Sequence, residues 1–321
     1  MSRLIFVPML PVKMRYSEWW VTEFPKQFSK YFDVTIIGKK FLESKNFNND
    51  DNKLFSPIDE SIQFELYQIH EYLQLELKLD DILFTCDLSF PGFFANVLHH
   101  RRPRKCYAFC HATSLNVGDY FENVRRSKWR VECGQSYLFD KVFVGSKYHY
   151  NKLTEIGLYP PFDGRTLDII GLPNPPMQTF KEEKKHNIIS VARPSYQKVN
   201  QEVEENIEKE FGKIVRKECN TWEEYYKFVS SGRILLITSR EDTFNYTILD
   251  AINNNTIVLA PNRIVFPEIL DERYLYNDIS DLKNKIYHYL LSSEYVVPEI
   301  KCSSLVDNFF ENLIKRMKEN E

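Results

Sequence analysis

Two pairs of charged residues in the second half of the chain have the types and spacing to hold a phosphorylated ligand. Arg193 and Lys198 lie five residues apart, after an apolar run at residues 187–191. Asp242 and Asp250 lie eight residues apart and bracket the polar end of a second apolar run, at residues 234–238. Cations at a strand-to-helix turn suit a diphosphate, and carboxylates suit sugar or ribose hydroxyls. The alternative is two exposed cations, a helix cap at Asp242 and a solvated helix face at Asp250.

The apolar pattern around these residues predicts a buried strand that ends in a polar elbow and continues as a helix. Residues 234–238 are apolar and mostly β-branched, residues 239–243 are polar, and helical spacing begins at Phe244. We therefore expect Asp242 at the start of the helix and Asp250 two turns later, on roughly the same face. Ligands of open α/β sheets bind outside the carboxyl ends of the strands, so this elbow is a candidate binding site.

Strand and helix patterns alternate through both halves of the chain and predict an α/β protein with two Rossmann-like lobes facing a cleft. The expected strands lie at residues 4–8, 34–37, 80–85, 105–110, 141–145, 167–170, 187–191, 234–238 and 257–260. Three prolines within residues 173–176 disfavour helix and indicate a linker. We expect an N-terminal lobe at 1–175, a C-terminal lobe at 176–298, and a final helix at 299–321 that could pack back on the first lobe.

Composition excludes several classes of protein. The 321 residues are 43% apolar and carry a net charge of −3, which is typical of a globular protein and not of a general polyanion binder. The six cysteines contain no C-x-x-C pair or zinc-type ligand set, which favours reduced thiols and a cytoplasmic location, the host cytoplasm if the protein is viral. We expect no signal peptide or transmembrane segment, because no apolar run approaches ~20 residues. A monomer or a homodimer is expected.

The segment at residues 239–251 resembles the E-x7-E segment of GT-B glycosyltransferases, in particular the retaining family four. The matching residues are Ser239, Asp242, Phe244, Asn245, Asp250 and Ala251, with aspartate in place of both family glutamates and Asn245 in place of a glycine. Arg193 and Lys198 match the two cations of the family pattern in type and spacing. Two weaker matches are Pro267-Glu268, similar to a "pEi" turn, and Leu172-Pro173-Asn174, similar to a "PNG" hinge. The resemblance covers residues 141–268 well and residues 1–131 in outline.

The resemblance implies a metal-independent enzyme that transfers a hexosyl or pentosyl group from a nucleotide sugar with retention. No cofactor is implied beyond this co-substrate, for which UDP is the favoured nucleotide. The implied catalytic residues are Arg193, Lys198, Asp242 and His111. The implied donor-binding residues are Asp250, Thr243, Phe244, Asn245 and Asn174. His111 ends the predicted strand at 105–110 and would contact the donor sugar from the other lobe; a purely structural histidine is an equal alternative.

The first half of the chain supplies candidates for the acceptor side. Arg15, Trp19 and Trp20 lie in or just after the first loop, which faces the acceptor in this fold class. Residues 99–130 carry eight Lys or Arg against two acidic residues. From this segment we expect four residues to flank the acceptor cleft: Arg101, Arg102, Arg125 and Arg126. A cationic rim beside aromatic rings suits a polyanion, whereas a solvated helix and tryptophans that pack on the sheet are the alternative.

Two acceptor classes follow. One is a hydroxyl on a modified base of double-stranded DNA, as in phage enzymes that glycosylate hydroxymethylated pyrimidines, where Trp19 or Trp20 could stack on a flipped base. The other is a surface glycan or lipopolysaccharide. The basic segment narrowly favours DNA. Two further interpretations remain: a catalytically degenerate GT-B protein that only binds, and an epimerase of the same architecture.

Overall fold

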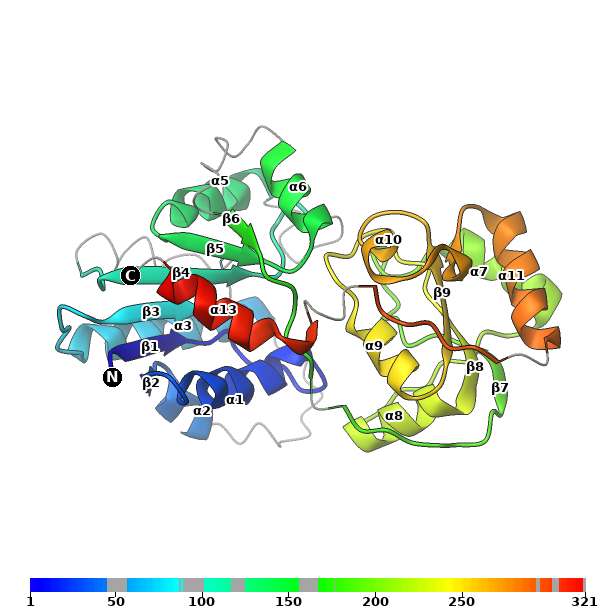
Figure 1. The fold of residues 1–321 in the computed structure, drawn as a ribbon, viewed down its shortest axis with the longest axis horizontal. Coiled ribbons are helices and arrows are strands. Elements are labelled where there is room, and N and C mark those ends of the chain that lie inside the picture. The colour runs from blue at the N-terminus through cyan, green and yellow to red at the C-terminus, as the bar shows by residue number, and fades with distance from the viewer. Residues whose placement is uncertain are drawn as a thin grey trace.

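The computed structural model describes residues 1–44, 57–86, 88, 101–116, 125–155, 167–175, 177–292, 295–301 and 306–319. These residues form two lobes, each built on a parallel sheet (Figure 1). The chain passes once from the first lobe to the second through the segment around residues 170–185, and it returns at its C-terminal end. The prediction of an α/β fold with two facing lobes is confirmed.

The N-terminal lobe contains a six-stranded sheet with the strand order β2-β1-β3-β4-β5-β6. Its strands are β1 (Arg3–Val7), β2 (Asp33–Ile36), β3 (Ile82–Thr85), β4 (Lys105–Cys110), β5 (Lys141–Val144) and β6 (Leu167–Ile169). All neighbouring strands pair in parallel. The central strands are buried on both faces, which explains their nearly continuous apolar sequences.

Helices cover both faces of this sheet (Figure 1). They are α1 (Tyr16–Phe28), α2 (Lys39–Ser44), α3 (Pro57–Gln74), α5 (Arg125–Ser136) and α6 (Lys147–Glu155). Each connects two parallel strands or follows one, as right-handed crossover connections require.

The C-terminal lobe contains a four-stranded parallel sheet with the order β10-β9-β8-β7. Its strands are β7 (His186–Ile189), β8 (Gly232–Leu236), β9 (Ile257–Pro261) and β10 (Leu275–Tyr276). Its helices are α7 (Gln201–Phe211), α8 (Trp222–Ser231), α9 (Tyr246–Asn253), α10 (Phe266–Ile269), the 3-10 helix η2 (Glu272–Tyr274) and α11 (Ile279–Leu291).

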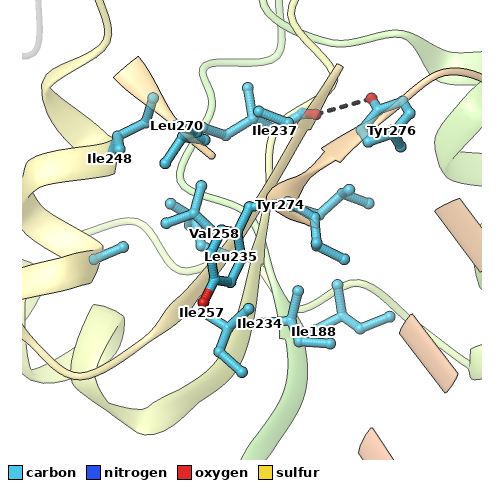
Figure 2. Close-up of a cluster of buried hydrophobic side chains, with 14 of the residues drawn as sticks. Ile188, Ile234, Leu235, Ile237, Ile248, Ile257, Val258, Leu270, Tyr274 and Tyr276 are labelled. Atoms are coloured by element: carbon cyan, nitrogen blue, oxygen red, sulfur yellow. Dashed lines mark hydrogen bonds between the residues drawn. The ribbon is translucent and has the colours of Figure 1, made fainter. Parts of the chain in front are cut away.

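The core of the C-terminal lobe holds the elbow after β8 in place. Figure 2 shows part of this core, with apolar side chains of the sheet, such as Ile188, Leu235 and Val258, beside Ile248 of α9. At its edge the Tyr276 hydroxyl donates a hydrogen bond of 2.9 Å to the Ile237 carbonyl (Figure 2). Because Ile237 is the residue after β8, this bond fixes the direction in which the chain leaves the sheet.

The final helix, α13 (Phe309–Lys318), lies on the N-terminal lobe, although it follows the C-terminal lobe in sequence (Figure 1). Phe309 and Leu313 are buried with the aromatic residues of α1 and the sheet. The Tyr107 hydroxyl donates a hydrogen bond of 2.8 Å to the Met317 carbonyl. No helix within the described ranges has both the length and the apolar character needed to cross a bilayer.

Candidate functional site

A cavity of about 340 Å³ lies between the lobes, at the carboxyl ends of strands from both sheets. From the N-terminal lobe it is lined by residues that follow β1, β4 and β5, and from the C-terminal lobe by residues that follow β7 and β8. The two parallel sheets therefore turn the same edge toward one space. In open α/β proteins this edge is where ligands bind.

The turn after β7 carries the two predicted cations into this cavity. Lys198 Nζ lies 2.8 Å from Asp242 Oδ2, and the Asp242 side chain is only 5% exposed. Burial raises the pKa of Asp242, and the Lys198 ammonium opposes that shift. Arg193 also lines the cavity and forms no hydrogen bond or ion pair through its side chain within the described part of the chain.

Arg15 faces the same group of cations from the N-terminal lobe. It lines the cavity, and burial together with the nearby Arg193 guanidinium lowers the pKa of Arg15 to about 10. Its side chain has no carboxylate partner among the described residues. Two uncompensated guanidinium groups on opposite walls make a site for an anion with at least two charges. We expected Arg15 on the acceptor side; the structure brings it next to Arg193.

The elbow after β8 differs from our prediction. Asp242 is not at the start of a helix, because α9 begins at Tyr246 and its cap is Asn245, whose side-chain oxygen accepts from Thr247 N. Asp242 lies three residues before the cap and accepts a hydrogen bond of 2.9 Å from Asn245 Nδ2. The argument that Asp242 and Asp250 share a helix face was therefore wrong. Competition between a helical pattern and a side-chain cap decided the boundary.

Asp250 lies deeper, in the middle of α9. It is 5% exposed and accepts a hydrogen bond of 2.8 Å from the Tyr225 hydroxyl. Burial raises the pKa of Asp250 to about 7. It lines a second cavity of about 510 Å³, together with Trp19, Trp222 and Tyr226.

The two cavities adjoin, because Arg15, Tyr16 and Tyr246 line both of them. The first is rich in charge and the second in aromatic rings. A ligand with a diphosphate in the first cavity and a flat, hydrophobic ring with hydroxyls in the second would match both.

His111 follows β4 and lines the first cavity. Its ring packs edge-on against Tyr16 and Trp20, at centroid distances of 5.4 and 5.8 Å. Its carbonyl accepts a hydrogen bond of 2.7 Å from the Thr243 hydroxyl of the other lobe.

The two predicted tryptophans have different positions. Trp20 is 1% exposed, packs in the core of the N-terminal lobe and borders the first cavity. Trp19 is half-buried at the second cavity, and its indole nitrogen is buried without a hydrogen-bond partner in the described residues. Thr243, Asn245 and the partly buried Phe244 also line the first cavity.

The structure does not bring Arg101 and Arg102 to the cleft. Both precede β4, whereas the cavity lies beyond its other end, at His111. Arg101 donates to the backbone carbonyls of Leu73 and Leu75. Arg102 pairs with Asp140 at 2.7 Å.

Three other predicted residues lie apart from the cavity or outside the description. Asn174 is exposed in the linker and lines neither cavity. Arg125 and Arg126 begin α5, but their side chains lie outside the described residues. The described ranges contain no group of three or more His, Cys, Asp or Glu side chains placed to hold a metal ion.

Contacts across the lobes involve residues that sequence reasoning did not assign to the site. The Glu268 carboxylate on α10 accepts from the backbone N–H groups of Lys147 and Tyr148, at 2.8 and 2.6 Å. It thus caps the N-terminus of α6 from the opposite lobe, where a negative charge is favourable. In the sequence, Glu268 attracted attention only as part of the Pro267-Glu268 turn. Nothing in its sequence surroundings indicates this partner.

A buried ion pair completes these contacts. Lys152, one turn further along α6, lies 2.7 Å from Glu241, with both side chains at most 10% exposed. The Tyr148 hydroxyl donates to the same carboxylate at 3.0 Å. Ser146 Oγ donates to the Thr243 carbonyl at 2.8 Å. The start of α6 is therefore held against the elbow that carries Asp242.

Comparison with solved structures identifies this two-lobed arrangement. Sucrose-phosphate synthase from Thermosynechococcus elongatus matches with a TM-score of 0.61 over 98% of this chain and 94% of its own, at 12% identity. The chain has the GT-B fold. TarM of S. aureus, in a complex that includes UDP, matches with a TM-score of 0.54 over 78% of this chain and 55% of TarM, at 16% identity. At these identities the likeness concerns the fold alone.

Sequence comparison gives one closer match over a shorter range. The tRNA-queuosine alpha-mannosyltransferase of Drosophila melanogaster is 31% identical over 124 residues. These residues make up 39% of this chain and 31% of the fly protein, so the chain spans less than a third of that relative's length. No protein-family model matches the chain.

Proposed function

We propose that this chain is a retaining glycosyltransferase that moves a sugar from a nucleoside diphosphate sugar to a hydroxyl group on a modified nucleic-acid base. The observation that carries the proposal is the pair Arg15 and Arg193, two guanidinium groups from opposite lobes that face one cavity without carboxylate partners in the described chain. A diphosphate would neutralise both through bidentate hydrogen bonds. The UDP in the TarM complex supports this ligand class and favours UDP over other nucleotides.

The proposed mechanism depends on where negative charge develops during the transfer. The bond between the sugar's anomeric carbon and the diphosphate oxygen breaks, and a bond from the acceptor oxygen to the same carbon forms on the same face. The acceptor proton passes to the departing phosphate oxygen. Arg193, Arg15 and Lys198 would stabilise the negative charge that builds on this oxygen, which is electrostatic catalysis by preorganised donors. Lys198 has three N–H donors and can keep its bond to Asp242 meanwhile.

The two carboxylates would bind hydroxyl groups. Asp242 lies at the first cavity and can accept a hydrogen bond from the transferred sugar. Asp250 lies at the second cavity, where Trp19, Trp222 and Tyr226 offer aromatic faces. We assign the ribose to Asp250 and the donor nucleobase to Trp222 and Tyr226, because an aromatic face can stack on any base.

The acceptor assignment rests on different support. The basic segment that favoured DNA contributes neither Arg101 nor Arg102 to the cleft. The fly relative is named for a mannosyl transfer to tRNA-queuosine, a modified nucleoside. A modified base in RNA, or a hydroxymethylated base in DNA, is therefore preferred over a glycan. The partly exposed Trp19 is the ring available to stack on such a base.

A thermal-shift screen against UDP, GDP, ADP and CMP sugars tests the donor assignment. A ligand at about 100 times its Kd stabilises the folded protein by about 2.7 kcal/mol, a shift of several degrees. We expect one nucleotide to produce this shift in the wild type and not in Arg193→Ala. Absence of a shift with every nucleotide sugar would contradict the proposal and favour a degenerate binding protein.

A transfer assay with the donor so identified tests the acceptor. Bulk tRNA, hydroxymethylated double-stranded DNA and a lipopolysaccharide preparation are incubated separately, and the nucleic acids are digested to nucleosides for mass spectrometry. We expect a nucleoside heavier by one sugar from one of the nucleic acids. Transfer to lipopolysaccharide alone would replace the acceptor class. Free sugar released without an acceptor would instead favour the epimerase alternative.

A further inference from the structure

His149 is a buried histidine whose ring has no role in the fold's own hydrogen bonding. It lies in the first turn of α6, is 1% exposed, and lines the first cavity. Neither ring nitrogen has a hydrogen-bond partner within the described residues, whereas its backbone N–H donates to Ser146 Oγ at 3.1 Å. Buried polar atoms are almost always paired, so an exception beside a cavity points to a ligand that completes the pairing.

The imidazole is uncharged in the free protein. Burial lowers the pKa of His149 to about 3, with smaller contributions from Lys152 and His111. A neutral imidazole has one N–H donor and one acceptor nitrogen. It therefore matches a hydroxyl group, which both donates and accepts, better than a phosphate, which only accepts.

The neighbours cannot satisfy this ring because their own groups are engaged. Lys152, one turn later on α6, is paired with Glu241 at 2.7 Å and donates to Asn116 Oδ1 at 3.2 Å. Ser146 is bonded to the Thr243 carbonyl. The local network thus uses its donors and acceptors elsewhere and leaves both imidazole nitrogens for another molecule.

The position of His149 favours the small donor over a macromolecular acceptor. Ser146 binds the residue next to Asp242, so the first turn of α6 lies against the elbow that carries this carboxylate. The ring is also buried in the wall of the cavity rather than at its rim. A base within a nucleic acid enters from outside, whereas the sugar of the proposed donor would lie between the diphosphate cations and the wall of the N-terminal lobe.

We propose that His149 hydrogen-bonds a hydroxyl group of the transferred sugar and thereby helps to select which nucleotide sugar is used. The inference rests on the proposed function, since it takes the first cavity to hold the sugar diphosphate. It concerns a residue that the resemblance to family four does not include. Its consequence is measurable. Replacing the imidazole should weaken binding of the nucleotide sugar and leave binding of the nucleotide without its sugar unchanged.

Two substitutions of nearly equal shape separate hydrogen bonding from packing. His149→Leu removes both the donor and the acceptor, while His149→Asn keeps one of each. Affinities for the nucleoside diphosphate and for its sugar conjugate are measured by calorimetry for both variants, the wild type and His288→Leu, an exposed histidine of α11. We expect His149→Leu to bind the conjugate at least about tenfold more weakly and the diphosphate within about twofold of wild type. His149→Asn should retain most of the conjugate affinity with an altered order of preference among sugars.

The melting temperature of the free protein provides an independent readout. Because His149→Leu removes unpaired buried polar atoms, its melting temperature should be unchanged or higher. A lower melting temperature with equal losses for diphosphate and conjugate would show a structural role and overturn the inference. Unchanged affinity for both ligands in His149→Leu would also overturn it and leave the proposed function standing. A wild-type protein that binds neither ligand would overturn both.

Discussion

The two walls of the first cavity are built from the same kind of sheet edge, yet they differ in chemistry. The wall from the C-terminal lobe carries charged side chains. Lys198 is bonded to Asp242 at 2.8 Å, and Arg193 lines the same cavity. The wall from the N-terminal lobe is formed largely by rings, among them His111 and His149. Arg15 is the exception, as a charge that faces Arg193 from that lobe.

This difference indicates that the two walls have different roles in binding. Paired charges hold their geometry before a ligand arrives, which suits a diphosphate whose charge must be stabilised at a fixed place. A neutral ring with unmet hydrogen bonds, as at His149, suits hydroxyl groups, whose pattern distinguishes one sugar from another. We expect substitutions in the C-terminal lobe to affect nucleotide binding and rate, and substitutions in the N-terminal lobe to affect the choice of sugar.

The largest effect is expected at Lys198. Lys198→Met leaves the buried Asp242 carboxylate without its cation, which costs about 3 kcal/mol of folding free energy. Transfer should fall by about 1,000-fold, because a donor to the departing diphosphate is lost. Urea denaturation and initial rates measure the two effects. The double variant Lys198→Met/Asp242→Asn should regain stability but not activity; recovery of both would remove the catalytic role of this pair.

Arg193→Ala separates rate from stability. Arg193 is exposed at the cavity and unpaired in the described structure, so we expect the free energy of unfolding to change by less than about 0.5 kcal/mol. The rate should fall by about 100-fold. Lys217→Ala, an exposed cation elsewhere in the lobe, is the matched control and should leave the rate unchanged. Equal rates in both variants would contradict the proposed phosphate site.

Asp250 makes stability depend on pH. Its pKa of about 7 in the folded state exceeds the ~3.9 of an unfolded chain, so the folded state holds a proton that the unfolded state releases. Its contribution is therefore fully present below about pH 4 and is lost as the pH rises toward 7. Asp250→Asn should be more stable than wild type at pH 8 by about 4 kcal/mol, with the difference shrinking toward pH 5.

Denaturation curves at several pH values check this prediction. Nucleotide binding should lower the pKa of Asp250 if a ribose hydroxyl donates to its carboxylate, so affinity should rise with pH through neutrality. A pH-independent affinity in the wild type would move the ribose elsewhere in the second cavity.

The smallest effect concerns the contact that holds the two walls together. Glu268→Gln weakens the cap that the C-terminal lobe places on α6, which should cost about 1 kcal/mol. Affinity for the nucleotide sugar should fall more than affinity for the free nucleotide, since α6 carries His149. Glu299→Gln, an exposed carboxylate, serves as the control. Equal losses for both ligands would mean that the cap supports the fold and not the sugar-binding wall.

Much of the C-terminal lobe follows from local sequence. The strand at 234–238, the polar elbow and the cations after β7 were predicted because each depends on a run of neighbouring residues. The start of α9 was misplaced because a single side chain, Asn245, determines it. Arg101 and Arg102 were misplaced for a different reason. Residues that precede a parallel strand lie at its amino end, away from this cavity. The prediction relied instead on the number of basic residues in the segment.

The sequence by itself determined the alternation of strands and helices and the placement of Arg193 and Lys198 after a strand. These features arise from the periodicity of apolar residues. Only the tertiary structure decided that Arg15 faces Arg193, that Glu268 caps α6 and that His149 lines the cavity. Each of these depends on how the two sheets dock, and docking is set by contacts between residues far apart in the chain, which no local pattern records.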